Sequence, residues 1–214
     1  MSKIHNIVNL LNEMGMLSLI PRSGFAFLGS GRQSVAEHSF RVTLAAYVLA
    51  RLIPHPLNLH KLVMMCLFHD LPEARIGDLN YVQKKYVVPQ LQKALDDIAS
   101  ESFLGPEIVA WIQEYEEGSS LEARLAHDAD QLELLLFLKQ EEELGNERAK
   151  YWMSAVLKRL QTEAGKQVAE AICQTSSDAW WYQDKSDPHW VDGGKAKQFS
   201  NQESDPNSDC LNSN

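Results

Sequence analysis

The sequence predicts an all-α fold, built as a single-domain helical bundle. Apolar residues recur at helical spacing through most of the chain, and almost no segment alternates apolar and polar residues as a half-buried strand does. Hydrophobic residues make up 44% of the 214 residues and charged residues 23%. These values are typical of a globular domain and exclude a chain that is disordered throughout.

The helices follow one another with short breaks. Apolar residues from Ile4 to Met14 predict a first helix that Gly15 ends, and an irregular segment over 17–34 follows. Ser119 and Glu122 have the spacing of a capping box, which predicts the start of a long helix that ends near Leu144. The remaining helices are predicted over 34–52, 58–70, 89–103, 106–117 and 147–174.

The predicted domain covers residues 1–182. After about Asp184 the composition shifts to Ser, Asn, Asp, Gly and Lys, with few apolar residues beyond Val191. Such a segment cannot bury enough apolar surface to offset the entropy lost on ordering, so 183–214 is predicted to be a disordered tail.

Charge and composition exclude several classes of protein. Lys and Arg number 20 against 29 Asp and Glu, and the net charge of −9 argues against binding to a nucleic acid polymer. The richest apolar window, Leu132 to Leu138, is too short for a membrane span and contains Glu133. The first 16 residues lack the features of a signal peptide, so a cytoplasmic protein is expected. Three scattered cysteines indicate neither a disulfide framework nor a cysteine zinc site.

Two segments place histidine in an apolar helical pattern. His38 shares a helix face with Val42 and Leu49 and should point inward, although a lone inward histidine is more often a hydrogen-bonded core residue than a ligand. His69 and Asp70 end an apolar helix, where Pro72 breaks the helical geometry and both side chains can converge. Taken alone, this pair could equally be an ion pair at a helix C-terminus.

The long helix carries two aspartates, Asp128 and Asp130, that lie about 200° apart around its axis. At most one of them can face a given site, and the apolar periodicity does not choose between them. A buried carboxylate without a partner is costly, so whichever faces inward must be paired or bound to a metal ion.

Together, these residues bring two imidazoles and two carboxylates from three helices, a set of ligands that suits a divalent first-row metal. Two further carboxylates, Glu73 and Asp78, follow His69 within nine residues. They lie where a turn at Gly77 would carry their side chains over the helix end.

The set formed by His38, the adjacent His69 and Asp70, and Asp130 resembles the HD superfamily of metal-dependent phosphohydrolases. Four segments more narrowly resemble the 5′-deoxynucleotidases of the HD-domain-containing protein 2 type: Ile20 to Phe25, Ser34 to His38, His69 to Asp78, and Glu114 to Arg124. The segment from Ala129 to Glu133 matches the final ligand motif of that family, which favours Asp130 over Asp128.

The resemblance implies hydrolysis of a nucleoside 5′-monophosphate, a small-molecule substrate, to nucleoside and phosphate. It implies one divalent ion (Mn, Co, Mg or similar) held by His38, His69, Asp70 and Asp130. Glu73 would orient or deprotonate the attacking water, and Asp78 would protonate the leaving oxygen or contact the sugar. Arg22 would hold the phosphate. A homodimer is also expected from the family.

One departure and two alternatives remain open. Some relatives that prefer deoxynucleotides have a Trp directly after the phosphate-binding Arg, where this chain has Ser23, so selectivity for deoxy over ribo substrates is not predicted. The same metal site could act on a nucleoside triphosphate or an alarmone, although few cations surround it. A non-catalytic regulatory module that keeps the fold is the third possibility.

Overall fold

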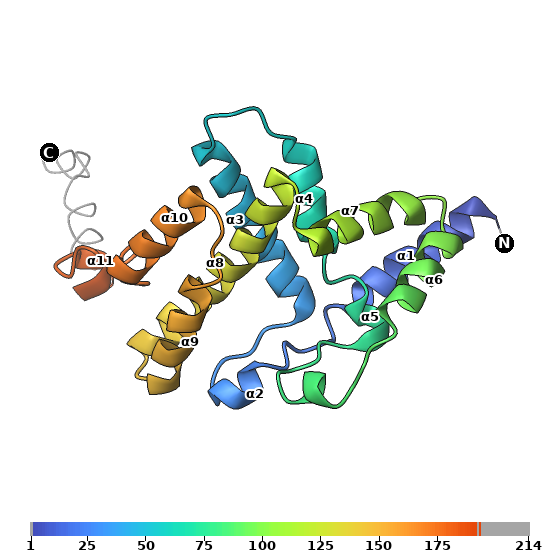
Figure 1. The fold of residues 1–214 in the computed structure, drawn as a ribbon. Helices are drawn as coiled ribbons and strands as arrows, with labels where there is room; N and C mark the ends of the chain where they lie inside the picture. Colours follow the sequence, from blue (N-terminus) through green and yellow to red (C-terminus); the bar gives the residue numbers. More distant parts are fainter. Residues whose placement is uncertain (1, 192, 194–214) are drawn as a thin grey trace, which may run out of the picture. The chain divides into compact units, whose positions relative to one another are not determined.

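The computed structural model describes residues 2–191 and residue 193 (Figure 1). Within this part of the chain the only β-type pairing is an isolated bridge between Pro21 and Ser34, so the predicted all-α fold is confirmed. The helices are α1 (Lys3–Met16), α2 (Phe25–Leu28), α3 (Val35–Leu52), α4 (Leu59–Phe68), α5 (Glu73–Ile76), the 3₁₀ turn η1 (Gln83–Lys85), α6 (Leu91–Glu101), α7 (Gly105–Glu117), α8 (Leu121–Glu143), α9 (Glu147–Leu157), α10 (Glu163–Gln174) and α11 (Pro188–Val191).

The chain divides into two units, residues 1–175 and the segment from Ser176 onward. The second unit contains α11 and a small group of aromatic rings in mutual contact, Trp181, Tyr182 and Trp190. The predicted disordered tail begins at residue 183, and its residues 192 and 194–214 lie outside the described part of the chain.

Helix α8 is the central element of the first unit, and α3, α4, α7, α9 and α10 pack around it (Figure 1). Leu125, Leu132 and Leu135 of this helix are fully buried. A helix that is covered on nearly all sides must be apolar nearly all round, which explains the leucine-rich sequence of α8. A polar side chain that is buried on α8, such as Asp128 or Glu133, therefore needs a partner inside the protein.

Two clusters of buried apolar side chains form the core of this unit. One surrounds α8 and includes Val42 and Cys66, and the other lies among α1, α6 and α7 and includes Val35 and Leu71. His38 lies between Val35 and Val42 in α3, and His69 lies between Cys66 and Leu71. Both histidines are thus positioned where the two clusters meet.

The single helix predicted over 147–174 is wrong, because the chain forms α9 and α10 with a break at residues 158–162. The backbone N–H groups of Gln161 and Thr162 donate to the carboxylate of Asp128 at 2.7 and 2.8 Å. Thr162 is also the N-cap of α10 and accepts from the N–H of Gly165. These interactions stabilise a helix start that the apolar periodicity did not reveal.

The expected capping box at Ser119 and Glu122 is also wrong. The N-cap of α8 is Ser120, which accepts from the N–H of Ala123. Glu122 instead accepts from the N–H of Asn58 at 2.8 Å, just before α4.

In the described residues, no helix combines the length and apolar character that a membrane crossing requires.

Candidate active site

Three side chains from three helices converge in the first unit. Ligand atoms of His38 (α3), His69 (the residue after α4) and Asp130 (α8) all lie within 4.8 Å of one another. The Nε2 atom of His38 is 3.0 Å from Oδ1 of Asp130. Of the two candidate aspartates on α8, Asp130 is the one that joins this cluster.

Asp70 lies at the edge of the same cluster. Its Oδ2 atom is 3.2 Å from Nε2 of His69 and 3.7 Å from Nε2 of His38. The same oxygen accepts a hydrogen bond from Arg22 at 3.1 Å. The structure thus brings the four expected ligands together, with Asp70 shared between the histidines and an arginine.

Both histidines are oriented by their second ring nitrogen. Nδ1 of His38 lies 2.8 Å from Oε2 of Glu133, and Nδ1 of His69 lies 2.9 Å from the carbonyl oxygen of Cys66. An oxygen without a proton can only accept, so each Nδ1 carries the hydrogen and donates. In the neutral ring the lone pair is then on Nε2, the atom that faces the cluster.

The carboxylates of the cluster stabilise positive charge on its histidines. Burial alone would lower the pKa of His69, but the charges of Asp70 and Asp130 outweigh it and raise that pKa to about 9. Burial would raise the pKa of Asp130, but its close contact and charge interaction with the His38 imidazole hold the pKa well below the usual range. Protons on the imidazoles thus balance the carboxylates, a role that a divalent cation can take over.

Glu73 lies close to this cluster with no partner for one oxygen. Its Oε2 atom is buried and makes no hydrogen bond in the structure. Burial and the charges of Asp70 and Asp78 raise the pKa of Glu73 to about 8. A carboxyl group in this environment can hold or release a proton near neutral pH, as a general acid or base must.

Arg22 and Asp78 are connected through the loop that precedes α2. The Oδ2 atom of Asp78 accepts from the N–H of Ser23 at 2.9 Å and lies 3.9 Å from Nε of Arg22. Asp78 thereby positions the loop at the residue that follows Arg22. The Arg22 guanidinium is directed at Asp70, beside the metal-ligand candidates.

Asp128 is fully buried and lies apart from the cluster. Both of its oxygens accept hydrogen bonds from the break between α9 and α10, including one from the hydroxyl of Thr162. Its partners are backbone and hydroxyl donors of a turn. Asp128 therefore stabilises the attachment of α10 to α8.

Three residues behind His38 support it and had no role predicted from the sequence. Glu133 is 1% exposed, and its Oε1 atom accepts from Gln33 at 2.7 Å and lies 3.0 Å from Nε of Arg41. The sequence feature that could have indicated this role of Glu133 is its place inside the apolar run from Leu132 to Leu138. A charged residue in such a run must be paired, and here it is paired with His38.

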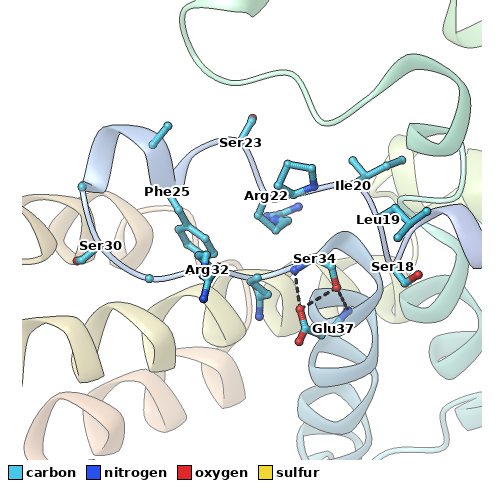
Figure 2. A pocket seen from close by; sticks show the side chains of 15 residues that line it. Ser18, Leu19, Ile20, Arg22, Ser23, Phe25, Ser30, Arg32, Ser34 and Glu37 are labelled. Atoms are coloured by element: carbon cyan, nitrogen blue, oxygen red, sulfur yellow. Dashed lines mark hydrogen bonds between the residues drawn. The ribbon is translucent and has the colours of Figure 1, made fainter.

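A cleft of about 880 Å³ lies along the segment from Ser18 to Glu37, with Arg22, Ser23 and Gln33 among its lining residues (Figure 2). The hydrogen bonds between Ser34 and Glu37 form the capping box that starts α3. Because His38 follows Glu37 directly, this cap fixes the start of α3 and thereby the position of the first histidine of the cluster.

The donor set fits a divalent metal ion. Nε2 of His38 is buried and makes no hydrogen bond of acceptable geometry, although carboxylate oxygens lie close to it. A buried imidazole nitrogen without a partner is costly, and a metal ion is the partner that two imidazoles and two carboxylates would share. The fold and this buried cluster together are those of a helical, metal-dependent phosphohydrolase.

The comparison with protein families agrees with this class. The model of the HD domain family matches residues 14–172, well over half of the chain. The chain therefore belongs to the HD domain family, and the resemblance seen in the sequence is confirmed. The matched range includes all seven residues of the predicted site, from Arg22 to Asp130.

Individual relatives are similar over most of this range. The 5′-deoxynucleotidase HDDC2 of Bos taurus is 28% identical over 66% of this chain and 70% of its own length. The protein of the same name from Dictyostelium discoideum is 30% identical over 66% of this chain and 82% of its own. A crystal structure of a Pyrococcus horikoshii protein, 27% identical, aligns with a TM-score of 0.67 over 78% of this chain and 98% of that one.

Proposed function

We propose that this protein is a metal-dependent phosphomonoesterase that hydrolyses (deoxy)nucleoside 5′-monophosphates to nucleoside and phosphate. The observation that carries the proposal is the buried cluster of His38, His69 and Asp130, with Asp70 and Arg22 beside it. The relatives named 5′-deoxynucleotidases support the choice of substrate.

In this proposal one divalent ion is held by His38, His69, Asp70 and Asp130. Such an ion polarises the phosphoryl group and lowers the pKa of a water molecule. Glu133 and the Cys66 carbonyl keep the two imidazoles in the tautomer that presents Nε2. Mn²⁺, Co²⁺ and Mg²⁺ are the ions to test.

Glu73 orients the attacking water and accepts its proton. Its buried, unpartnered Oε2 atom is free to take a new hydrogen bond, and its raised pKa makes it a stronger base than an exposed glutamate. Asp78 holds the loop at Ser23 and supplies a carboxyl group near the leaving 5′-oxygen or the sugar.

Arg22 binds the phosphate. Its guanidinium already lies against Asp70, and several N–H groups of a guanidinium can donate at once, so it can contact a phosphate oxygen beside the ion. Ser23 follows Arg22, and its buried Oγ atom has no hydrogen-bond partner in the structure. In some relatives the residue at this position is associated with a preference for deoxynucleotides, and rates on matched ribo- and deoxyribonucleotides measure that preference directly.

The test is phosphate release from a panel of ribo- and deoxyribonucleoside monophosphates with Mn²⁺, Co²⁺ or Mg²⁺ added. Glu73→Ala should keep the ion and the fold but lower turnover by roughly 10²–10⁴-fold, the usual contribution of a general acid or base. Glu117→Ala is the matched control, because Glu117 is exposed at the end of α7. Absence of monophosphate hydrolysis by the metal-loaded wild-type protein would refute the proposed function.

A further inference from the structure

A second cavity, of about 480 Å³, is lined by residues of α8 and α9 and of the segments that follow Arg22 and Asp78. Its lining includes four aromatic residues, Phe27, Tyr81, Tyr151 and Trp152. Tyr81 and Tyr151 are 73% and 76% exposed. Exposed aromatic side chains that gather around a cavity form a surface on which a flat, apolar ligand can stack.

Three segments of the chain contribute residues both to this cavity and to the candidate active site. Gly24 follows Arg22 and Ser23, Tyr81 comes three residues after Asp78, and Leu134 lies about one helical turn after Asp130 on α8. Part of the cavity wall is therefore built from the same loop, the same turn and the same helix as the site, and the rest comes from α9 and the residues that follow it.

A chain of hydrogen bonds also connects the two. Arg159, at the rim of the cavity, donates to Oε1 of Gln131 at 3.4 Å, and Gln131 donates to Oδ2 of Asp130 at 2.9 Å. The guanidinium of Arg159 is thus two hydrogen bonds away from a proposed metal ligand.

We propose that this cavity binds the nucleobase of the substrate while the 5′-phosphate lies at Arg22 and the metal ion. The proposal rests on the proposed function and adds the place where the base is recognised. The aromatic rings stack on the base, and Arg159 donates to acceptor atoms on its edge. Gly24 has no side chain, and a Cβ atom there would make an ordinary contact with the Trp152 ring at 3.8 Å, so the loop and α9 face each other at this point.

The cleft along the segment from Ser18 to Glu37 is less suitable for a base. Among the described residues that line it, the only aromatic one is Phe25, which is 8% exposed and whose ring stacks on Phe137 with 4.3 Å between the centroids. One face of that ring is thus covered, and little of the side chain is exposed. Arg32, which lines this cleft and is exposed, serves as a probe for it.

The test compares two substrates of the metal-loaded protein, a deoxynucleoside 5′-monophosphate and 2-deoxyribose 5-phosphate, which lacks the base. Ala155 is exposed and lines the cavity, so Ala155→Trp fills the space with little effect on the core. Tyr81→Ala removes one stacking surface. Each change should lower the ratio of kcat/KM for the nucleotide to that for the sugar phosphate at least about fivefold, the low end of the range for loss of base stacking.

The matched controls are Ser154→Trp, which adds the same bulk at the preceding exposed position of α9, and Tyr86→Ala, which removes a tyrosine that is 82% exposed and does not line the cavity. Both should leave the ratio unchanged. Binding of the nucleotide, followed by calorimetry, should weaken in Ala155→Trp and not in Ser154→Trp.

The outcomes separate the two proposals. If the wild-type protein hydrolyses nucleotides and Ala155→Trp keeps the wild-type ratio and affinity, the cavity does not bind the base and only this inference fails. A fall in the ratio with Arg32→Ala instead would place the base in the other cleft and overturn the inference as well. If the wild-type protein neither binds nor hydrolyses nucleotides, the proposed function fails, and the inference fails with it.

Discussion

Asp128 and Asp130 are two residues apart on helix α8, yet they lie in opposite surroundings. Asp128 accepts from two backbone N–H groups and one hydroxyl group at the break before α10. Asp130 faces His38 and His69, and it accepts a hydrogen bond from the side chain of Gln131 outside the cluster. The first carboxylate is satisfied by donors that do not titrate, and the second lies beside imidazoles that can gain or lose a proton.

This difference shows how the same residue type serves two purposes on one helix. Neutral donors at short distances stabilise a carboxylate without creating a need for a cation. Imidazole nitrogens beside a carboxylate create an environment in which protons or a metal ion must supply the positive charge. The neighbours, and not the aspartate itself, distinguish a structural contact from a metal site.

The largest effect is expected for Asp130→Ala. Loss of this carboxylate removes one of the proposed ligands and part of the charge that attracts the ion, so bound metal should be lost and phosphate release should fall at least about a hundredfold. Metal analysis of the purified variant and an activity assay measure both. An Asp130→Ala protein that retains its metal would contradict the assignment of this residue.

Asp128→Ala should show the reverse pattern. The N–H groups of Gln161 and Thr162 would lose their acceptor inside the protein, and the free energy of unfolding should fall by about 3 kcal/mol. Urea denaturation measures this loss, and metal analysis should find the ion retained. If Asp128→Ala loses the ion while Asp130→Ala keeps it, the roles of the two residues are exchanged.

Glu133→Leu tests how much the cluster around Asp130 depends on the residue that orients His38. The substitution removes the acceptor that holds Nδ1 of His38, so the affinity for the metal ion should fall roughly 10–100-fold. Metal titration measures the affinity directly. Glu141→Leu is the control, since Glu141 is also a buried glutamate of α8 but bonds to Ser30 outside the cluster. An equal loss of affinity in both variants would indicate a general effect on the helix.

The smallest effect is expected for Gly165→Ala, on the Asp128 side. A Cβ atom at this position would lie 2.3 Å from Oδ2 of Asp128, so the turn must shift, and stability should fall by about 1–2 kcal/mol even though alanine favours the helix. Gly15→Ala is the control, because Gly15 lies in α1 with nothing within 4 Å of its Cβ position. Gly15→Ala should stabilise the protein by roughly 0.5–1 kcal/mol in the same denaturation assay.

Local signals account for the helices that were predicted with nearly correct bounds. Ser34 caps α3 and Asn58 caps α4, and both helices also carry a clear apolar face. The short helices α2 and α5 were not predicted, because one helical turn is too short to show a period. The break between α9 and α10 was missed because its stabilising carboxylate, Asp128, is more than thirty residues away in the chain.

The sequence by itself determined the all-α class, the order of the longer helices and the HD family, because helical periodicity, caps and an adjacent His-Asp pair are local features of the chain. Periodicity could not decide between Asp128 and Asp130, and only the family motif favoured one of them. The tertiary structure showed which aspartate meets the histidines and which one holds α10, and it revealed the support that Glu133 gives to His38. Those contacts join residues up to about a hundred positions apart, so they depend on how whole helices pack and not on the sequence around each residue.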